Sequence, residues 1–233
     1  MTDGLRVASY NVHKCVGTDY RRRPERTAKV IDELQADVVA LQEVDRRLGA
    51  RPKTITATSL RQFTKLEPVD IARNDTSLGW HGNALLLNSS YNVMNVSHLE
   101  LPGLEPRGAV KVSIETGGFH FAVVAVHLGL LRRSRRAQLA RIVASLTDRE
   151  RARTIILGDF NERRQEKGLE ALNTDFTVLP SGRSYPTFAP FAPFDRIAIG
   201  RSIGGHATNV HRSKLARRAS DHFPVFTDLA LRA

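Results

Sequence analysis

Cysteine, tryptophan and long apolar runs are scarce in this chain of 233 residues, which has one cysteine and one tryptophan. The single Cys15 excludes an internal disulfide and any cysteine-rich zinc site. No apolar run approaches the roughly 20 residues that a membrane-spanning helix needs. The first residues, 1–6, lack the basic-then-apolar layout of a signal peptide. We therefore expect a cytoplasmic protein without a transmembrane segment.

Acidic residues are also outnumbered, because 35 lysines and arginines face 24 aspartates and glutamates, for a formal net charge of +11. This charge favours polyanionic partners: nucleic acid, phosphoinositides or an anionic membrane surface. The alternative is that the excess arginine is only solvated surface, since net charge speaks to association rather than to fold. The sequence does not indicate an oligomeric state.

The apolar segments predict an α/β fold in a single domain over residues 1–233, because no linker or repeat divides the chain. Two stretches share a strand–helix–strand pattern, with strands over 5–12 and 38–41 around a helix from Pro24, and strands over 119–128 and 153–157 around a helix from about Ser134. The other expected elements are strands over 80–88, 91–99, 109–115, 194–199 and 223–231, a short helix with Leu60, Phe63 and Leu66, and a hairpin turn at Gly117-Gly118.

Polar residues follow all four strands of the two repeated patterns. As many residues separate Asn11 from Glu43 as separate His127 from Asp159. Right-handed crossovers place both strand ends of each pair on the same edge of a sheet. We therefore expect two similar halves that face each other, with these four polar residues meeting at one rim.

The stretch Gly158-Asp159-Phe160-Asn161 is the clearest of these strand ends. Glycine lets the backbone turn sharply as it leaves the sheet. Asp159 and Asn161 then lie at the carboxyl end of a strand, where open α/β sheets hold their ligands. The alternative is an ordinary Asp-Asn turn that closes a strand.

Glu43 and Asn11 provide a carboxylate and a neutral amide oxygen at the ends of the first pair of strands. Such oxygen donors suit a hard cation such as Mg²⁺ or Mn²⁺, whereas zinc prefers more histidine or cysteine. The alternative for Glu43 is a solvated carboxylate at a strand end.

His127 follows an apolar strand, and Arg132, Arg133, Arg135 and Arg136 come shortly after it. Together with the backbone N–H groups of a helix start, these cations would form a phosphate site. The alternatives are a core histidine and a solvated basic turn of helix.

A second histidine, His222, lies between Asp221 and a predicted strand near the carboxyl end of the sequence. Its near-neutral pKa would suit proton transfer at the rim of the sheet. Asp195, at the start of another strand, would accept the second ring N–H of His222 and fix its tautomer. Otherwise Asp195 pairs with Arg196 or caps a turn.

Six short motifs, in order along the chain, closely resemble the endonuclease/exonuclease/phosphatase superfamily, which has the fold of DNase I and exonuclease III. They run from about residue 6 to residue 229 and are Ser9-Tyr10-Asn11-Val12-His13, Leu41-Gln42-Glu43-Val44, Gly82-Asn83-Ala84, Val126-His127-Leu128, Gly158-Asp159-Phe160-Asn161 and Ser220-Asp221-His222-Phe223-Pro224. The resemblance implies a four-layer α/β sandwich of two facing mixed β-sheets flanked by helices.

The resemblance also implies metal-dependent hydrolysis of a phosphoester. Glu43 would be the main Mg²⁺ ligand, with Asn11 beside it and Asp221 close by. Asp159 and Asn161 would position the attacking water and the phosphate, and His127 would bind the scissile phosphate. His222, oriented by Asp195, would act as a base or as a phosphate-binding cation, and either Asp159 or His222 would take the proton of the water. The expected substrate-binding residues are Arg107, Asn83, Arg132 and Arg133.

Three functions remain open at this point. A nuclease is favoured by the positive charge, although the sequence shows no aromatic-rich surface on which bases would stack. A phosphodiesterase or phosphatase for lipid headgroups or small molecules, similar to sphingomyelinases and inositol phosphatases, fits the compact length. A non-catalytic binding protein on the same fold is disfavoured, because every expected catalytic position is occupied.

Overall fold

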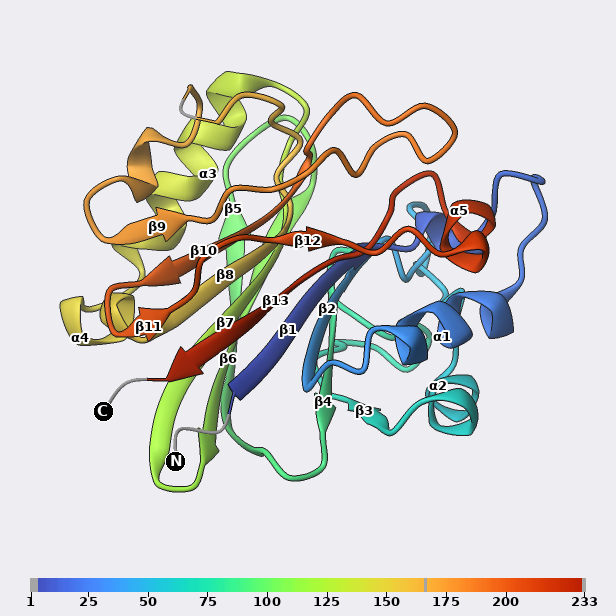
Figure 1. Ribbon diagram of the computed structural model, residues 1–233, viewed down its shortest axis with the longest axis horizontal. Helices are drawn as coiled ribbons and strands as arrows, with labels where there is room; N and C mark the ends of the chain where they lie inside the picture. Colours follow the sequence, from blue (N-terminus) through green and yellow to red (C-terminus); the bar gives the residue numbers. More distant parts are fainter. Residues whose placement is uncertain (1–3, 166, 232–233) are drawn as a thin grey trace.

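The computed structural model describes residues 4–165 and 167–231, in which two β-sheets pack face to face between two groups of helices (Figure 1). The helices α3 (Arg132–Ala144) and α4 (Asp148–Ala152) cover one side. The helices α1 (Pro24–Glu33), α2 (Ala57–Phe63) and α5 (Lys214–Ala219) lie on the other. The expected sandwich of mixed sheets and helices is confirmed.

The first sheet has the strand order β11-β13-β1-β2-β4-β3, and β12 pairs with β13 beside this path. Only β1 and β2 run parallel, while every other pairing is antiparallel. The bounds are β1 Gly4–Asn11, β2 Val38–Gln42, β3 Leu66–Pro68, β4 Ala84–Asn88, β11 Ile203–Gly204, β12 Asn209–Val210 and β13 Val225–Leu231.

The second sheet has the order β5-β6-β7-β8-β10-β9. Here β7 and β8 form the parallel pair, which mirrors β1 and β2 of the first sheet. The bounds are β5 Asn92–Leu101, β6 Arg107–Thr116, β7 Phe119–His127, β8 Thr154–Asp159, β9 Phe176–Val178 and β10 Asp195–Gly200.

The apolar runs of the central strands are continuous because these strands are buried on both faces. Along β7, Val123 belongs to the core between the two sheets, whereas Val124 packs in the core beneath α3. The same alternation separates Ile155 from Ile156 on β8, as the two-residue period of a strand requires. Two hydrophobic cores therefore hold the second sheet, one on each face.

Helix boundaries follow local chemistry. Pro24 is the first residue of α1, a position at which the backbone N–H that proline lacks would have no partner within the helix. Thr147 and Glu150 form a capping box at the start of α4, and Ser213 caps α5 by accepting a hydrogen bond from Ala216. Two 3₁₀ turns complete the helical elements, at His13–Cys15 and Glu170–Leu172.

Several boundaries differ from expectation. The strand expected from residue 80 begins at Ala84, because Trp80 and Asn83 form a tight turn closed by reciprocal backbone hydrogen bonds. Leu66 starts β3 instead of extending the helix that ends at Phe63, and α3 begins at Arg132 rather than near Ser134. The short elements α4, α5, β3, β9, β11 and β12 were not predicted. Among the helices described, none is both long enough and apolar enough to cross a membrane.

Candidate active site

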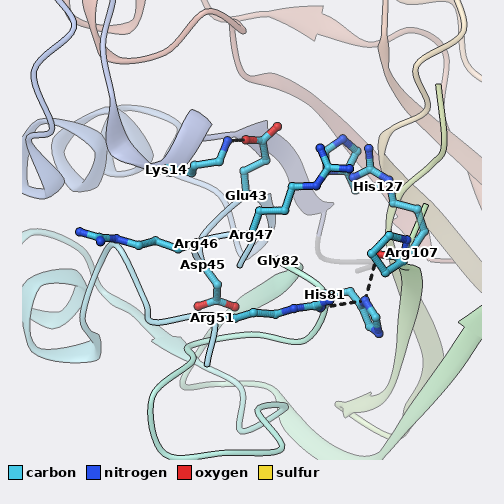
Figure 2. Close-up of a pocket in the computed structure, with 11 residues that line it drawn as sticks. Lys14, Glu43, Asp45, Arg46, Arg47, Arg51, His81, Gly82, Arg107 and His127 are labelled. Atoms are coloured by element: carbon cyan, nitrogen blue, oxygen red, sulfur yellow. Dashed lines mark hydrogen bonds and ion pairs between the residues drawn. The ribbon is translucent and has the colours of Figure 1, made fainter. Parts of the chain in front are cut away.

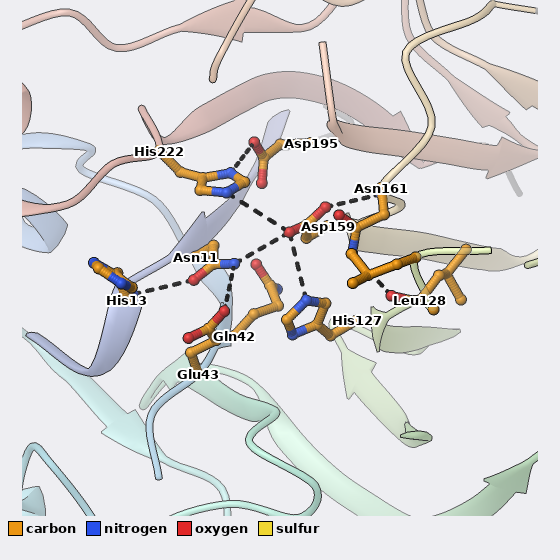
Figure 3. A network of polar contacts seen from close by, with 12 residues as sticks. Asn11, His13, Gln42, Glu43, His127, Leu128, Asp159, Asn161, Asp195 and His222 are labelled. Atoms are coloured by element: carbon orange, nitrogen blue, oxygen red, sulfur yellow. Dashed lines mark hydrogen bonds and ion pairs between the residues drawn. The ribbon is translucent and has the colours of Figure 1, made fainter. Parts of the chain in front are cut away.

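The carboxyl ends of the two parallel strand pairs meet at one rim of the sandwich (Figure 3). In the first sheet Asn11 is paired with Gln42, one residue before Glu43; in the second, His127 is paired with Asp159. The structure thus brings together the four polar residues whose equal spacing suggested two facing halves.

Asp159 lies at the centre of this rim and is almost completely buried, with 2% of its surface exposed. Its Oδ2 accepts a hydrogen bond from Asn11 Nδ2 at 3.1 Å and lies 3.5 Å from His127 Nε2 and 3.8 Å from His222 Nε2. Its Oδ1 accepts a hydrogen bond from the backbone N–H of Asn161 at 2.8 Å. Burial raises the pKa of Asp159. This carboxylate therefore touches groups from both sheets.

Gly158 does not turn the chain out of the sheet as expected: it lies within β8, paired with Val126 and Arg196, and lets the strand continue to Asp159. Gly158 has a φ of +153°, and a Cβ atom added there would lie 1.9 Å from the carbonyl oxygen of Val126 on β7. Only glycine allows β8 to approach its neighbour this closely with that backbone conformation. Asn161 follows with a φ of 52°, and its Nδ2 donates to the carbonyl of Leu128 at 2.9 Å.

His222 and Asp195 form a buried pair, in which His222 Nδ1 lies 2.9 Å from Asp195 Oδ2. The same carboxylate oxygen accepts a hydrogen bond from Ser184 Oγ at 2.6 Å. Burial alone would lower the pKa of His222, but Asp195 and Asp159 outweigh it and raise that pKa to about 10. Asp195 is not paired with Arg196, whose guanidinium donates instead to backbone carbonyls and a glutamine side chain.

The pKa of His127 is shifted in the opposite direction to that of His222. His127 is equally buried, and burial lowers its pKa to about 4 despite the neighbouring carboxylates of Asp159 and Glu43. At neutral pH the structure therefore holds one neutral and one charged histidine against the same carboxylate.

Glu43 stands just beyond the end of β2 in a left-handed conformation, with a φ of 58°. Asn11 Nδ2 donates to its Oε1 at 3.4 Å, and the ammonium group of Lys14 contacts its Oε2. Burial alone would raise the pKa of Glu43, but the charges of His127 and Lys14 prevail and lower it to about 2. Glu43 is therefore ionised at neutral pH, and its main partner is a cation.

The donor set around Glu43 suits a hard divalent cation. It would consist of the ionised carboxylate of Glu43 and of Asn11 Oδ1, with water as the remaining ligands. In the structure Asn11 turns its Nδ2 toward Glu43, and its Oδ1 accepts the N–H of His13, so the amide would have to turn over to bind the ion. Asp221 lies further along the same rim, 3.7 Å from His13 Nδ1, while the backbone N–H of His13 donates to Asn11 Oδ1 at 3.0 Å. No contact within the described chain joins Asp221 directly to Glu43.

Asp159, Asp195 and His222 form a second group of closely spaced potential metal ligands, whose ligand atoms lie within 4.8 Å of one another. There, however, the Asp195–His222 hydrogen bond already uses one ring nitrogen and one carboxylate oxygen. His222 Nε2 and Asp195 Oδ1 stay outside this bond, but the pKa of His222, raised to about 10, leaves that ring protonated at neutral pH and unable to bind a metal ion. Glu43 and Asn11 are the better-suited metal ligands.

The expected substrate-binding residues lie in different surroundings. Asn83 is completely buried, and its Nδ2 donates to the carbonyl of Gly108 at 3.0 Å, so it supports the turn beside Trp80 and offers no surface to a ligand. Arg107 lies at the start of β6 and lines the pocket shown in Figure 2, with Glu43 and His127.

Arg132 and Arg133 lie at the start of α3. Arg132 Nε pairs with the buried carboxylate of Glu162 at 3.3 Å, and Arg133 is exposed. The same carboxylate binds Arg135, whose side chain is buried and also donates to two backbone carbonyls of the loop before α3. In the structure this basic segment is therefore anchored by Glu162, and no contact joins it to His127 or Asp159 among the residues described.

Two groups of functional interest were not foreseen. Lys14 contacts Glu43, and Arg46, Arg47 and Arg51 line the pocket beside it (Figure 2). The sequence carried a weak signal for the arginines, because they closely follow the motif that contains Glu43. The second group is aromatic: the Tyr185 ring lies 4.7 Å from the His222 ring, centroid to centroid.

The fold and the site together define a hydrolase scaffold, and comparison with known proteins gives the family. A model of the Endonuclease/Exonuclease/phosphatase family matches residues 8–222, and the chain belongs to this family. An uncharacterized Escherichia coli K12 protein, YbhP, is 29% identical over 97% of this chain and 96% of its own length.

Solved structures agree on the fold. A functionally unknown conserved protein from Enterococcus faecalis superposes with a TM-score of 0.77 at 22% identity, covering 98% of this chain and 100% of that one. A mannosyl-6-phosphatase from Bacteroides thetaiotaomicron gives a TM-score of 0.73 at 16% identity, over 97% and 100% of the two chains.

Proposed function

We propose that this protein is a phosphoester hydrolase that depends on a divalent cation, Mg²⁺ or Mn²⁺, and that it cleaves phosphodiesters, with nucleic acid as the first candidate. The observation that carries the proposal is the network around Asp159, in which one buried carboxylate meets Asn11, His127 and His222. Hydrolysis of a phosphodiester requires a positioned water, a proton acceptor and groups that stabilise negative charge, and this network offers residues suited to each of these tasks.

The roles of the residues follow from their charge. Glu43 and Asn11 would hold the cation, which when bound neutralises charge on the phosphate oxygens. Asp159 would orient the attacking water and accept its proton, because the raised pKa of His222 leaves that ring protonated and unable to act as base. His222, held by Asp195, would then stabilise the developing negative charge, and neutral His127 would donate a hydrogen bond to the phosphate.

Exposed aromatic rings near His222 support a nucleic acid substrate. The segment after Tyr185 carries Phe188 and Phe191, with exposed fractions of 77% and 57%. Phe191 also contacts Tyr185, with their ring centroids 6.2 Å apart. Bases stack on such rings, and the net charge of +11 would attract the strand. The sequence alone does not predict this aromatic surface, because its members are brought together by the turn that follows Tyr185.

An apolar patch supports a second candidate, a phosphodiesterase for lipid headgroups. Leu104, Leu130 and Leu131 have exposed fractions of 82%, 64% and 47%, and the loops that carry them are joined by a hydrogen bond of 2.8 Å. Arg132 and Arg133 follow directly. Apolar side chains next to cations suit an anionic membrane surface. In that case Leu130→Ser would slow hydrolysis of sphingomyelin in vesicles but not of a soluble diester.

The first experiment measures hydrolysis of bis-p-nitrophenyl phosphate with Mg²⁺ or Mn²⁺. We expect turnover that stops with EDTA, and a loss of several orders of magnitude in Asp159→Ala. Asp148→Ala is the matched control, since it removes a carboxylate that is 87% exposed on α4. Full activity in Asp159→Ala would refute the proposed site, and no turnover by the unaltered protein with either metal ion would leave a binding protein on the same fold.

The second experiment compares substrate classes: nicked and abasic DNA, RNA, phosphoinositides and sphingomyelin. Turnover of nucleic acid that falls steeply with salt would support a nuclease. Turnover confined to lipid headgroups would support the second candidate.

A further inference from the structure

Resting on the proposed function, we infer that the pocket beside Glu43 and His127 binds a second phosphate group of the substrate, next to the phosphoester that is hydrolysed. Glu43 and His127 form one wall of this pocket, so it opens directly onto the proposed active site (Figure 2). The enclosed and adjoining open space measures about 580 Å³. The ligand class is a phosphate group carried by the same molecule as the scissile bond.

The pocket is strongly cationic. Five of its lining side chains are lysine or arginine and two are carboxylates. One of the carboxylates, Asp45, is turned into the protein, where it accepts hydrogen bonds from the backbone N–H groups of Leu78 and Gly79 at 2.8 and 3.1 Å. The other is Glu43, which Lys14 already neutralises. The remaining arginines have no acid to balance them inside the pocket.

Two of these arginines have hydrogen-bonding capacity that the protein leaves unused. Among the residues described, no side chain or carbonyl accepts a hydrogen bond from the guanidinium of Arg47. Arg107 pairs with Glu105 at 2.9 Å through Nη2, yet its Nε is buried without a partner. A buried donor without an acceptor is costly, and an anion in the pocket would remove that cost. In Figure 2 the side chains of Arg47, Arg107 and His127 converge at one end of the pocket.

The loop that carries the arginines is fixed at its base. The N–H of Arg46 donates to the carbonyl of Pro52 at 2.9 Å, and Asp45 ties the same strand end to the segment at residues 78–79. Arg51 Nη1 lies 2.9 Å from His81 Nδ1, across the pocket floor. The guanidinium groups are thus presented from an anchored turn, which lowers the entropy lost when a ligand binds.

Phosphate is the anion that fits best. A guanidinium presents a planar fork of N–H groups that matches phosphate oxygens, and several guanidiniums together suit a group of more than one negative charge. The second phosphate would come either from the next phosphodiester of a nucleic acid strand or from a bisphosphorylated small molecule. Both sources share the same recognition chemistry.

The test measures binding in EDTA, where the proposed turnover is stopped, by calorimetry in a phosphate-free buffer. Two ligand pairs are compared: thymidine 3′,5′-bisphosphate with thymidine 5′-monophosphate, and glucose 1,6-bisphosphate with glucose 6-phosphate. We expect the second phosphate to tighten binding roughly tenfold or more. A gain only in the thymidine pair would identify a nucleic acid strand as the source, and a gain only in the glucose pair a small molecule.

Arg47→Ala and Arg51→Ala should reduce this gain to less than about threefold, because each removes a charged donor of the pocket. Arg47 makes no side-chain hydrogen bond or ion pair to the residues that the structure describes, so this variant should leave the fold intact. The matched control, Arg201→Ala, removes an exposed arginine in the turn between β10 and β11 and should keep the full gain.

No gain in either ligand pair, or the same gain in Arg47→Ala as in Arg201→Ala, would overturn the second-phosphate site. Because binding is measured without turnover, this result is independent of the proposed hydrolysis. A protein that binds the bisphosphates selectively but hydrolyses no diester with Mg²⁺ or Mn²⁺ would retain the site and refute the proposed function.

Discussion

Lys14 occupies the position opposite Glu43 that a metal ion would need, and this predicts an unusual effect of removing it. The ammonium group contacts Glu43 Oε2, and 31% of the Lys14 side chain and 23% of the Glu43 side chain are exposed. A divalent cation would have to displace this ion pair to bind the carboxylate. Lys14→Met should therefore bind Mn²⁺ more tightly than the unaltered protein.

The size of the effect follows from the burial of the pair. Exposed ion pairs contribute about 0.2–1 kcal/mol, and pairs that are fully buried cost several times more to break. Since both side chains are partly exposed, we assign about 1 kcal/mol to breaking the Lys14–Glu43 ion pair. This free energy corresponds to roughly a fivefold change in the dissociation constant for Mn²⁺. Lys14 also helps to lower the pKa of Glu43, against the burial that raises it.

The assay is calorimetric titration of metal-free protein with Mn²⁺ at neutral pH. Lys65→Met is the matched control, because it removes an exposed lysine outside the site and should leave the affinity unchanged. Lys14→Arg should restore the competition. Equal or weaker Mn²⁺ binding by Lys14→Met would refute the displacement and indicate that Lys14 assists the metal site.

Three further predictions concern the buried groups. In metal-free protein at neutral pH, ring nitrogen NMR shifts should show a charged His222, whose pKa is raised to about 10, and a neutral His127, whose pKa is lowered to about 4; two rings that both titrate near the usual value would contradict this. Asp195→Asn should lower kcat roughly a hundredfold or more and lower the pKa of His222, because an amide stabilises the charged ring poorly; an unchanged pH profile would argue against it. Gly158→Ala should lower the free energy of unfolding in urea by about 3 kcal/mol or more, since its Cβ would meet a carbonyl at 1.9 Å. Gly117→Ala, which is open to solvent, should cost only about 1 kcal/mol, and equal losses would exclude the steric explanation.

The paired strands and their polar ends could be predicted from the sequence, because they depend on local patterns. The apolar run before Gly158 and the equal spacing of the strand ends were enough to place Asn11, Glu43, His127 and Asp159 at one rim. The pairing of Asp195 with His222 came from the residue types, and the structure has it at 2.9 Å.

The remaining features depend on contacts between distant segments. Asp45 anchors the arginine loop to residues more than thirty positions away, so the closeness of Arg47 to the Glu43 motif was the only local sign that it differs from solvated surface. Glu162 similarly looked like any acid beside the motif, yet it is buried with Arg135. Short elements such as α5 were missed because their few residues carry too little periodicity to stand out.

The position of β13 has a consequence for the biosynthesis of the protein. Although it lies furthest along the chain of all the described strands, β13 pairs with β1, so that Gly4 is matched with Ala230 and Ser9 with Val225. The segment just before it carries His222. During synthesis β1 would leave the ribosome early, but it could pair with β13 only after some two hundred further residues had been added. The nascent chain would thus gain its charged histidine only when the first sheet closes, so that hydrolytic competence and completion of the fold arrive in a single late step.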